Sequence, residues 1–307
     1  MKTAATLTIA CAILCCQPVK AQNYIGPMQT GESKTHFDLS NPSNYSHGTV
    51  NVGIALSEGL VLAADSRVTL MTQATFPGYM VVSDNNSKVF AIGNFGVSTY
   101  GLAFLQNRTI ASWVADYDAK QSHKEDDVNS FASRFSSYIG KLYDDDPTTK
   151  EKPILGFLIG GYNSHGDGKL LVLEFPTIRE PKEVKNTKTT QGAQWTGDTE
   201  TIMRLVKGTD PKMGLWPIWN TLTDNQKTEV GKDFDGLEYA IPWNTLMLQD
   251  GVDFALSMVR VTVTFQRFSY GTVANAGSIP TVGGAVDILV VRPSGTEWVK
   301  RKVLIAE

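Results

Sequence analysis

The feature that most constrains the fold is a pair of apolar runs that predicts a buried β-hairpin. In residues 50–56 every second side chain is large and apolar, which is the pattern of a half-buried strand. Residues 60–64 form a short, continuously apolar run, as in a strand that is buried on both faces. Glu58-Gly59 stands between the two runs and favours a tight turn.

The two ends of this hairpin carry polar residues of an unusual kind. Gly48 and Thr49 precede the first strand, and Asp65 and Arg67 follow the second. Glycine has no Cβ and adopts backbone angles that are closed to other residues, so the Gly48 carbonyl can bend toward an attacking group. The Thr49 hydroxyl could be that group. The hairpin therefore brings a candidate nucleophile and a charged pair to one end.

These residues resemble the start of a mature proteasome β-type subunit, which is an N-terminal-nucleophile (Ntn) hydrolase. Proteins of that family cleave themselves after a glycine, expose a threonine, and carry Ala-Asp-Ser-Arg sixteen residues later. Here Thr49 and Asp65 have that spacing, since 65 − 49 = 16. The resemblance implies an α+β fold, a four-layer αββα sandwich in which two mainly antiparallel sheets pack face to face with helices outside.

Composition agrees with a globular chain and excludes some partners. The 307 residues are 42% hydrophobic and 19% charged, with a formal net charge of −3. This charge gives no reason to expect a nucleic acid or an anionic membrane as a partner. Only two histidines follow Thr49, His123 and His165, and neither lies near an acid–serine pattern. We therefore expect no metal, no cofactor and no Ser-His-Asp triad.

Residues 1–21 have the pattern of a secretory signal peptide. Lys2 gives the positive start, residues 7–14 the apolar core, and Val19-Lys20-Ala21 a cleavage site with a small final residue. The apolar run is too short for a stable membrane span. We expect an exported protein, periplasmic or extracellular. A lipoprotein anchored through Cys11 is an alternative.

All three cysteines lie within the signal segment, at Cys11, Cys15 and Cys16. An exported chain without them has no disulfide, no catalytic cysteine and no thiolate metal site. Residues 22–48 are rich in Asn, Ser, Gly and Pro and lack apolar periodicity. They are either a disordered leader or a propeptide that blocks the Thr49 amine, and we favour the propeptide because it ends where the nucleophile begins.

From residue 49 to 307 the pattern predicts one Ntn-hydrolase domain with an insertion near 208–243. The stretch 68–87 is expected to be a loop or an irregular strand. Further strands are expected at 88–92, 95–99, 154–162, 169–175, 187–194, 285–292 and 296–305. Helices are expected to open at Gly101, after Asp127, and at Asp198 as N-cap, and to span 223–231 and 246–268.

Cutting the Gly48–Thr49 bond would create the base that the threonine needs. A hydroxyl is a weak nucleophile and requires a base within hydrogen-bond reach. The freed α-amine of Thr49 has a reference pKa of about 7.7–8.0, close to working pH. A nearby cation such as Lys88 would favour the neutral amine, and Asp65 would anchor Lys88 and keep it charged.

The resemblance implies a role for each matching residue. Thr49 is nucleophile and base together, and Asp65 and Lys88 tune it. The backbone N–H of Gly101, at the expected start of a helix, is the oxyanion donor, and such a donor contributes about 2.7–4 kcal/mol. Thr196 supports the amine.

Two further positions complete the comparison with the family. Arg67 is expected to give structural support. Ile279, with Ser278 beside it, stands where the family has an aspartate, which leaves the second support of the amine in question.

The sequence thus predicts an exported N-terminal-threonine hydrolase that cuts itself at Gly48–Thr49 and then hydrolyses amide bonds, with peptides as the favoured substrates. The resemblance also implies a homo-oligomer, as a ring. A non-catalytic scaffold subunit is one alternative, motivated by Ile279 and the insertion. An amidase for small non-peptide amides is another, since the segments 68–87 and 208–243 would line its pocket.

Overall fold

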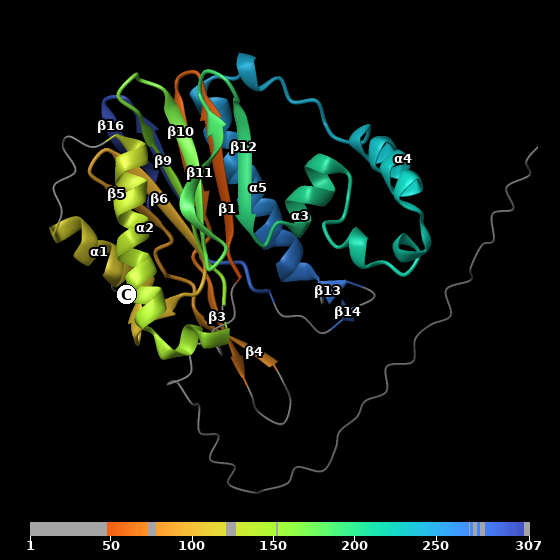
Figure 1. Cartoon of the computed structure of the whole chain (residues 1–307), viewed down its shortest axis with the longest axis horizontal. Helices are drawn as coiled ribbons and strands as arrows, with labels where there is room; N and C mark the ends of the chain where they lie inside the picture. Colours follow the sequence, from red (N-terminus) through yellow and green to blue (C-terminus); the bar gives the residue numbers. More distant parts are fainter. Residues whose placement is uncertain are drawn as a thin grey trace, which may run out of the picture. The chain divides into compact units, whose positions relative to one another are not determined.

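In the computed structural model, the hairpin predicted near residue 50 lies at the centre of a five-stranded antiparallel sheet (Figure 1). Its strand order is β12-β1-β2-β15-β16. On β1, Asn51 lies opposite Ala64 of β2 on one side and Thr196 of β12 on the other. The bounds are β1 (Val50–Leu56), β2 (Gly59–Ala64), β12 (Gly192–Gly197), β15 (Asp287–Arg292) and β16 (Gly295–Lys300).

A second five-stranded antiparallel sheet packs against the first and has the order β11-β10-β9-β6-β5. Leu62, Leu158, Leu170 and Leu289 are among the buried side chains that fill the space between the two sheets. The bounds are β5 (Val89–Ile92), β6 (Phe95–Gly101), β9 (Leu155–Tyr162), β10 (Gly168–Phe175) and β11 (Ile178–Asn186).

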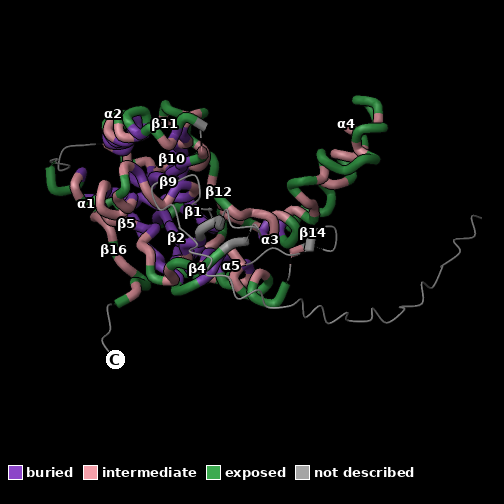
Figure 2. Tube along the Cα trace, turned by 90° about the horizontal axis from the view of Figure 1, so that it is seen from below, coloured by how far each residue is buried: buried purple, intermediate pink, exposed green. Residues whose placement is uncertain are grey.

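Helices cover the outer face of each sheet. α1 (Ile110–Lys120) and α2 (Val128–Asp145) bury an aromatic cluster against the second sheet, and α3 (Glu200–Ile202) and α5 (Leu248–Phe268) pack on the first. Figure 2 shows the buried residues concentrated where these layers meet. The predicted four-layer αββα sandwich is confirmed, because three separate apolar cores lie between four layers.

The described part of the chain comprises residues 48–72, 78–120, 127–151, 153–269, 271–272, 275–276 and 280–303. The predicted signal segment 1–21 lies outside it, and so does the predicted leader up to residue 47. Ile279 and Ser278 lie outside it too. The helix α4 (Asp224–Asp235) falls in the predicted insertion and begins with a capping box at Thr223.

The remaining elements are short. They are β3 (Val68–Thr72), β4 (Gly78–Ser83), β7 (Phe104–Leu105), β8 (Arg108–Thr109), β13 (Gly271–Thr272), β14 (Asn275–Ala276), the 3-10 helices η2 (Pro147–Glu151), η4 (Met213–Leu215), η5 (Trp219–Thr221) and η6 (Trp243–Thr245), and the π-helical turn η3 (Met203–Lys207). Among the described helices, none combines the length and the apolar character that a membrane crossing requires.

Several expected boundaries were wrong. The strand expected at 187–194 is β12, shifted toward the C-terminus, and β11 was missed altogether. β11 is the edge of its sheet and carries five charged residues in nine, so it lacks the apolar signal of a strand; charged side chains are common on edge strands. The last strand, β16, ends at Lys300 rather than at residue 305.

Two expected helix starts were also wrong. Gly101 ends β6 instead of opening a helix, and α1 begins only at Ile110, after the small β7–β8 hairpin. The N-cap of α3 is Thr199, because the Asp198 carboxylate bonds elsewhere. The stretch after Arg67, expected as a loop or an irregular strand, contains a two-stranded hairpin, β3–β4, with a register shift between Val68 and Thr69.

The buried leucines between the sheets generate a stability prediction. Leu62 is fully buried there, so Leu62→Ala should lower the free energy of unfolding by about 2–5 kcal/mol through lost burial and a new cavity. Leu215 is 77% exposed, and Leu215→Ala is the matched control with little expected effect. Urea denaturation measures both, and equal losses would contradict the packing described.

Candidate active site

The Asp65 carboxylate joins the segments that meet at the end of the central hairpin. It is 1% exposed. Its Oδ1 accepts hydrogen bonds from Lys88 Nζ, at an N–O distance of 3.0 Å, and from the Val50 backbone nitrogen, at 3.1 Å. Its Oδ2 accepts the N–H groups of Arg67 at 3.1 Å and Gly283 at 3.0 Å. These four bonds satisfy a carboxylate whose burial would otherwise be very costly.

Lys88 connects this carboxylate to the Gly48–Thr49 bond. It stands directly before β5 and is 3% exposed, and its Nζ donates to the Gly48 carbonyl oxygen at 2.8 Å as well as to Asp65. Burial lowers the pKa of Lys88, while the charge and hydrogen bond of Asp65 oppose that shift. The neutral form is thus more accessible than in a solvated lysine.

Thr49 lies at the head of β1 beside Lys88 and is 4% exposed. Its carbonyl oxygen accepts the N–H of Asp198 at 2.6 Å. Thr49 lines a cavity of about 10 Å³ together with Gly48, Lys88, Thr99 and other residues. A space of this size holds about one water molecule. The side chain of Thr49 thus faces very little free space in the described chain.

Glycine is required at two positions next to Thr49: at Gly48, which precedes it in the chain, and at Gly197 of the neighbouring strand β12. A Cβ on Gly48 would lie 1.9 Å from the Thr281 carbonyl oxygen, which no side chain could tolerate. Gly197 has a φ of +81°, and a Cβ there would lie 2.0 Å from the Thr49 carbonyl oxygen. The chain around the candidate scissile bond is thus held by backbone contacts that exclude any larger residue.

Gly101 lies near Thr49 but not at a helix start. Its expected place at a helix start is wrong, because β6 ends there and the chain turns with a φ of +83°. A Cβ at Gly101 would lie 2.1 Å from the Ile154 carbonyl oxygen. Gly101 nevertheless lines the same small cavity as Thr49. Its role as an oxyanion donor stays a prediction, now without the helix terminus to support it.

Thr196 lies on β12 opposite Asn51 of β1, and Asn51 is two residues after Thr49. Its hydroxyl is buried and has no hydrogen-bond partner among the described residues. Buried hydroxyls are normally bonded. A hydroxyl in this condition near Thr49 is able to bond a new donor, such as a freed amine.

The Arg67 guanidinium pairs with Asp84, while the Asp65 carboxylate accepts the Arg67 backbone N–H. Its Nε and Nη2 donate to the Asp84 carboxylate at 2.7 and 3.0 Å, and its Nη1 donates to the Pro280 carbonyl oxygen at 3.2 Å. This ion pair lowers the pKa of Asp84. Because Arg67 and Asp84 flank the β3–β4 hairpin, the pair joins its two ends and supports the loop that reaches Asp65.

Three residues at this site were missed as functional candidates: Asp198, Gln266 and Thr281. Their side chains bond one another next to Gly48 and Thr49. Asp198 was expected only as a helix cap. No local pattern links the three, because they come from segments that are far apart in the sequence and meet only in the fold.

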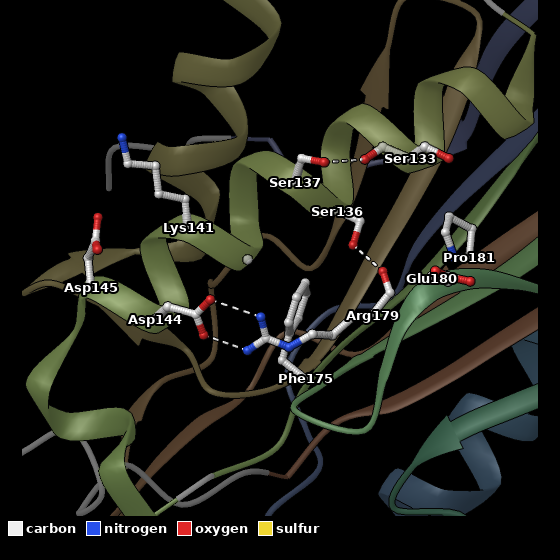
Figure 3. Close-up of a pocket in the computed structure, with 11 residues that line it drawn as sticks. Ser133, Ser136, Ser137, Lys141, Asp144, Asp145, Phe175, Arg179, Glu180 and Pro181 are labelled. Atoms are coloured by element: carbon white, nitrogen blue, oxygen red, sulfur yellow. Dashed lines mark hydrogen bonds and ion pairs between the residues drawn. The ribbon is translucent and has the colours of Figure 1, made fainter.

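A much larger cavity, of about 820 Å³, lies between α2 and β11 (Figure 3). Arg179 crosses it and forms a bidentate ion pair with Asp144, and the Ser136 hydroxyl donates to the Arg179 carbonyl oxygen. Its lining residues come from the outer helix α2, from the edge strand β11 and from Phe175 at the end of β10. None of the predicted site residues lines it. In the described ranges no group of three His, Cys, Asp or Glu side chains is arranged to hold a metal ion.

The buried Asp65–Lys88 pair generates a stability prediction. In a Thr49→Ala background, Asp65→Asn should lower the free energy of unfolding by about 3–5 kcal/mol, because it leaves Lys88 buried without its counter-charge. Adding Lys88→Met to Asp65→Asn removes that uncompensated charge and should recover part of the loss. Urea denaturation measures the series, and a double variant less stable than Asp65→Asn would contradict the pairing.

Known proteins resemble this chain in structure but not in sequence. No protein-family model matches it, and no curated protein matches its sequence. Solved structures do match. One is Anbu (ancestral beta-subunit) from Yersinia bercovieri, with a TM-score of 0.49 and 14% identity over 81% of this chain and 86% of that one.

The Gly-1 mutant of Anbu from Hyphomicrobium sp. strain MC1 gives a TM-score of 0.50 and 13% identity over 83% of this chain and 86% of that one. At these identities the likeness concerns the fold alone. The chain has an Anbu-like α+β Ntn fold, as the sequence predicted.

Proposed function

We propose that the chain is a precursor that cuts itself between Gly48 and Thr49 and then uses Thr49 as an N-terminal nucleophile on amide bonds, with peptides as the substrates. The observation that carries the proposal is the Lys88 Nζ hydrogen bond to the Gly48 carbonyl oxygen, at 2.8 Å. The Thr49 hydroxyl would attack the carbon of this carbonyl group. A donor on its oxygen polarises the bond and stabilises the developing negative charge.

The first step is an acyl shift from nitrogen to oxygen. The Thr49 Oγ bonds to the Gly48 carbonyl carbon, the Gly48–Thr49 C–N bond breaks, and the hydroxyl proton ends on the released Thr49 nitrogen. Water then hydrolyses the ester, which leaves a Gly48 carboxylate and a free Thr49 hydroxyl and amine. Neutral Lys88 has two N–H bonds for its two acceptors and one lone pair, which suits it to relay the proton.

After the cut, the same residues serve a substrate amide. The Thr49 amine becomes the base for its own hydroxyl, since its reference pKa of about 7.7–8.0 is close to neutral pH. The unpartnered Thr196 hydroxyl is available to bond that amine. Loss of the residues before Thr49 would open the cavity of about 10 Å³, so the uncut chain is latent.

Three parts of the proposal rest on the sequence. Residues 1–21 support export, and the Gly48-Thr49 and Ala-Asp-Ser-Arg pattern supports a homo-oligomer and peptide substrates by resemblance. A non-catalytic scaffold subunit is the second candidate, favoured by Ile279 at the position where the family has an acid. That candidate predicts a chain that folds but stays uncut.

The cut itself is the first test. Full-length chain made in a purified cell-free system should lose the residues up to Gly48, and intact-mass analysis should find a product that begins with Thr49. Thr49→Ala should stay uncut because the attacking oxygen is gone. Thr221→Ala, at an exposed threonine in η5, is the control and should be cut at the normal rate. Cutting of Thr49→Ala at the same bond would mean that another enzyme does the work.

The pH dependence of self-cleavage tests the role of Lys88. Since burial lowers the pKa of Lys88 and its neutral form is the proton relay, the rate should rise with pH and level off below about 10.4, the reference pKa of a free lysine. Lys88→Arg should abolish the rise, because arginine stays charged. The exposed Lys300→Arg serves as control. A rate that falls as pH increases would show that charged Lys88 is the active form.

A further inference from the structure

A hydrogen-bonded link between Asp198 and Gln266 lies beside the Gly48–Thr49 bond and takes no part in the chemistry proposed above. Asp198 follows β12, and its backbone N–H donates to the Thr49 carbonyl oxygen at 2.6 Å. Its Oδ2 accepts a hydrogen bond from Nε2 of Gln266, which lies in the last turn of α5. The Thr281 hydroxyl lies 3.3 Å from the same oxygen.

The orientation of the Gln266 amide follows from its neighbours. Its Oε1 lies 2.8 Å from the backbone nitrogens of both Thr281 and Val282. Backbone N–H groups only donate, so the amide oxygen must face them and the NH₂ group must face Asp198. Gln266 therefore connects an ionised acceptor on one side to two backbone donors on the other.

The link closes a ring of contacts around the scissile bond. Thr281 packs directly on Gly48, since a Cβ on Gly48 would lie 2.1 Å from the Thr281 Cβ. The ring therefore runs from Thr49 through Asp198, Gln266 and Thr281 to Gly48. In this ring Asp198 donates to the Thr49 carbonyl oxygen and Thr281 packs against Gly48. Lys88 donates separately to the Gly48 carbonyl oxygen.

We propose that the Asp198–Gln266 hydrogen bond positions Gly48 against Thr49 for self-cleavage. Neither side chain touches the reacting atoms, so both are positioning residues. The proposal rests on the proposed function, because it concerns the same bond. Its physical basis is that an intramolecular attack depends on near-contact geometry, and that a displacement of about 1 Å can reduce a rate about a hundredfold.

The test exchanges donor and acceptor across the link. In Gln266→Glu the carboxylate still accepts from Thr281 and Val282, but it has no proton for Asp198 and faces it with a like charge. Self-cleavage of the full chain should slow by about tenfold to a hundredfold. Adding Asp198→Asn gives an amide that donates to the carboxylate introduced at position 266, so the double variant should return to within about threefold of the wild-type rate.

A matched control lies on the same helix. Gln249, in the first turn of α5, is exposed and donates its Nε2 to Asp253, so Gln249→Glu makes the same change far from Gly48 and should not alter the rate. Rates come from intact mass after cell-free synthesis, and thermal unfolding in a Thr49→Ala background confirms that each variant folds.

The outcomes separate the two proposals. Wild-type chain that never cuts would overturn the proposed function, and this inference with it. Wild-type chain that cuts, with Gln266→Glu cutting at the same rate, would overturn the inference alone. So would a folded double variant that stays as slow as Gln266→Glu, because a restored hydrogen bond would then have no effect.

Discussion

The site depends on one buried carboxylate. Asp65 accepts four hydrogen bonds, from the start of β1, from Lys88 before β5, from its own turn and from Gly283 before β15. These groups come from segments of both sheets, and their hydrogen bonds to the one Asp65 carboxylate fix their relative positions. An ionised carboxylate inside a protein requires such partners. The same bonds that stabilise the junction therefore also aim Lys88 at the Gly48 carbonyl.

Close packing of the backbone also restricts the chain around Thr49. Gly48 and Gly197 stand where neighbouring backbone leaves no space for a Cβ, and the cavity beside Thr49 holds about one water molecule. Under the proposed function, such close packing suits a reaction within the chain before any reaction with an outside substrate. Removal of the residues that precede Thr49 would, under the same proposal, create the space that a substrate needs.

Sequence predicted the features that have a local signal. The β1–β2 hairpin follows from periodicity, whereas the grouping of Thr49, Asp65 and Lys88 was implied by the resemblance to proteasome β-type subunits. Periodicity missed β11, since that edge strand carries charges, and the short β7–β8 hairpin displaced the helix expected at Gly101. It missed the Asp198–Gln266 link because its two side chains lie 68 residues apart and bond only through tertiary packing.

The central claim is that Thr49 becomes a nucleophile with its own amine beside it. The most direct measurement is labelling by an electrophile with adjacent ketone and epoxide groups, which closes a ring only with a hydroxyl and an amine on neighbouring carbons. Peptide mass mapping of the purified chain should find one label, on a peptide that begins with Thr49. A protein that begins at Thr49, hydrolyses amides and carries no label there would contradict the account.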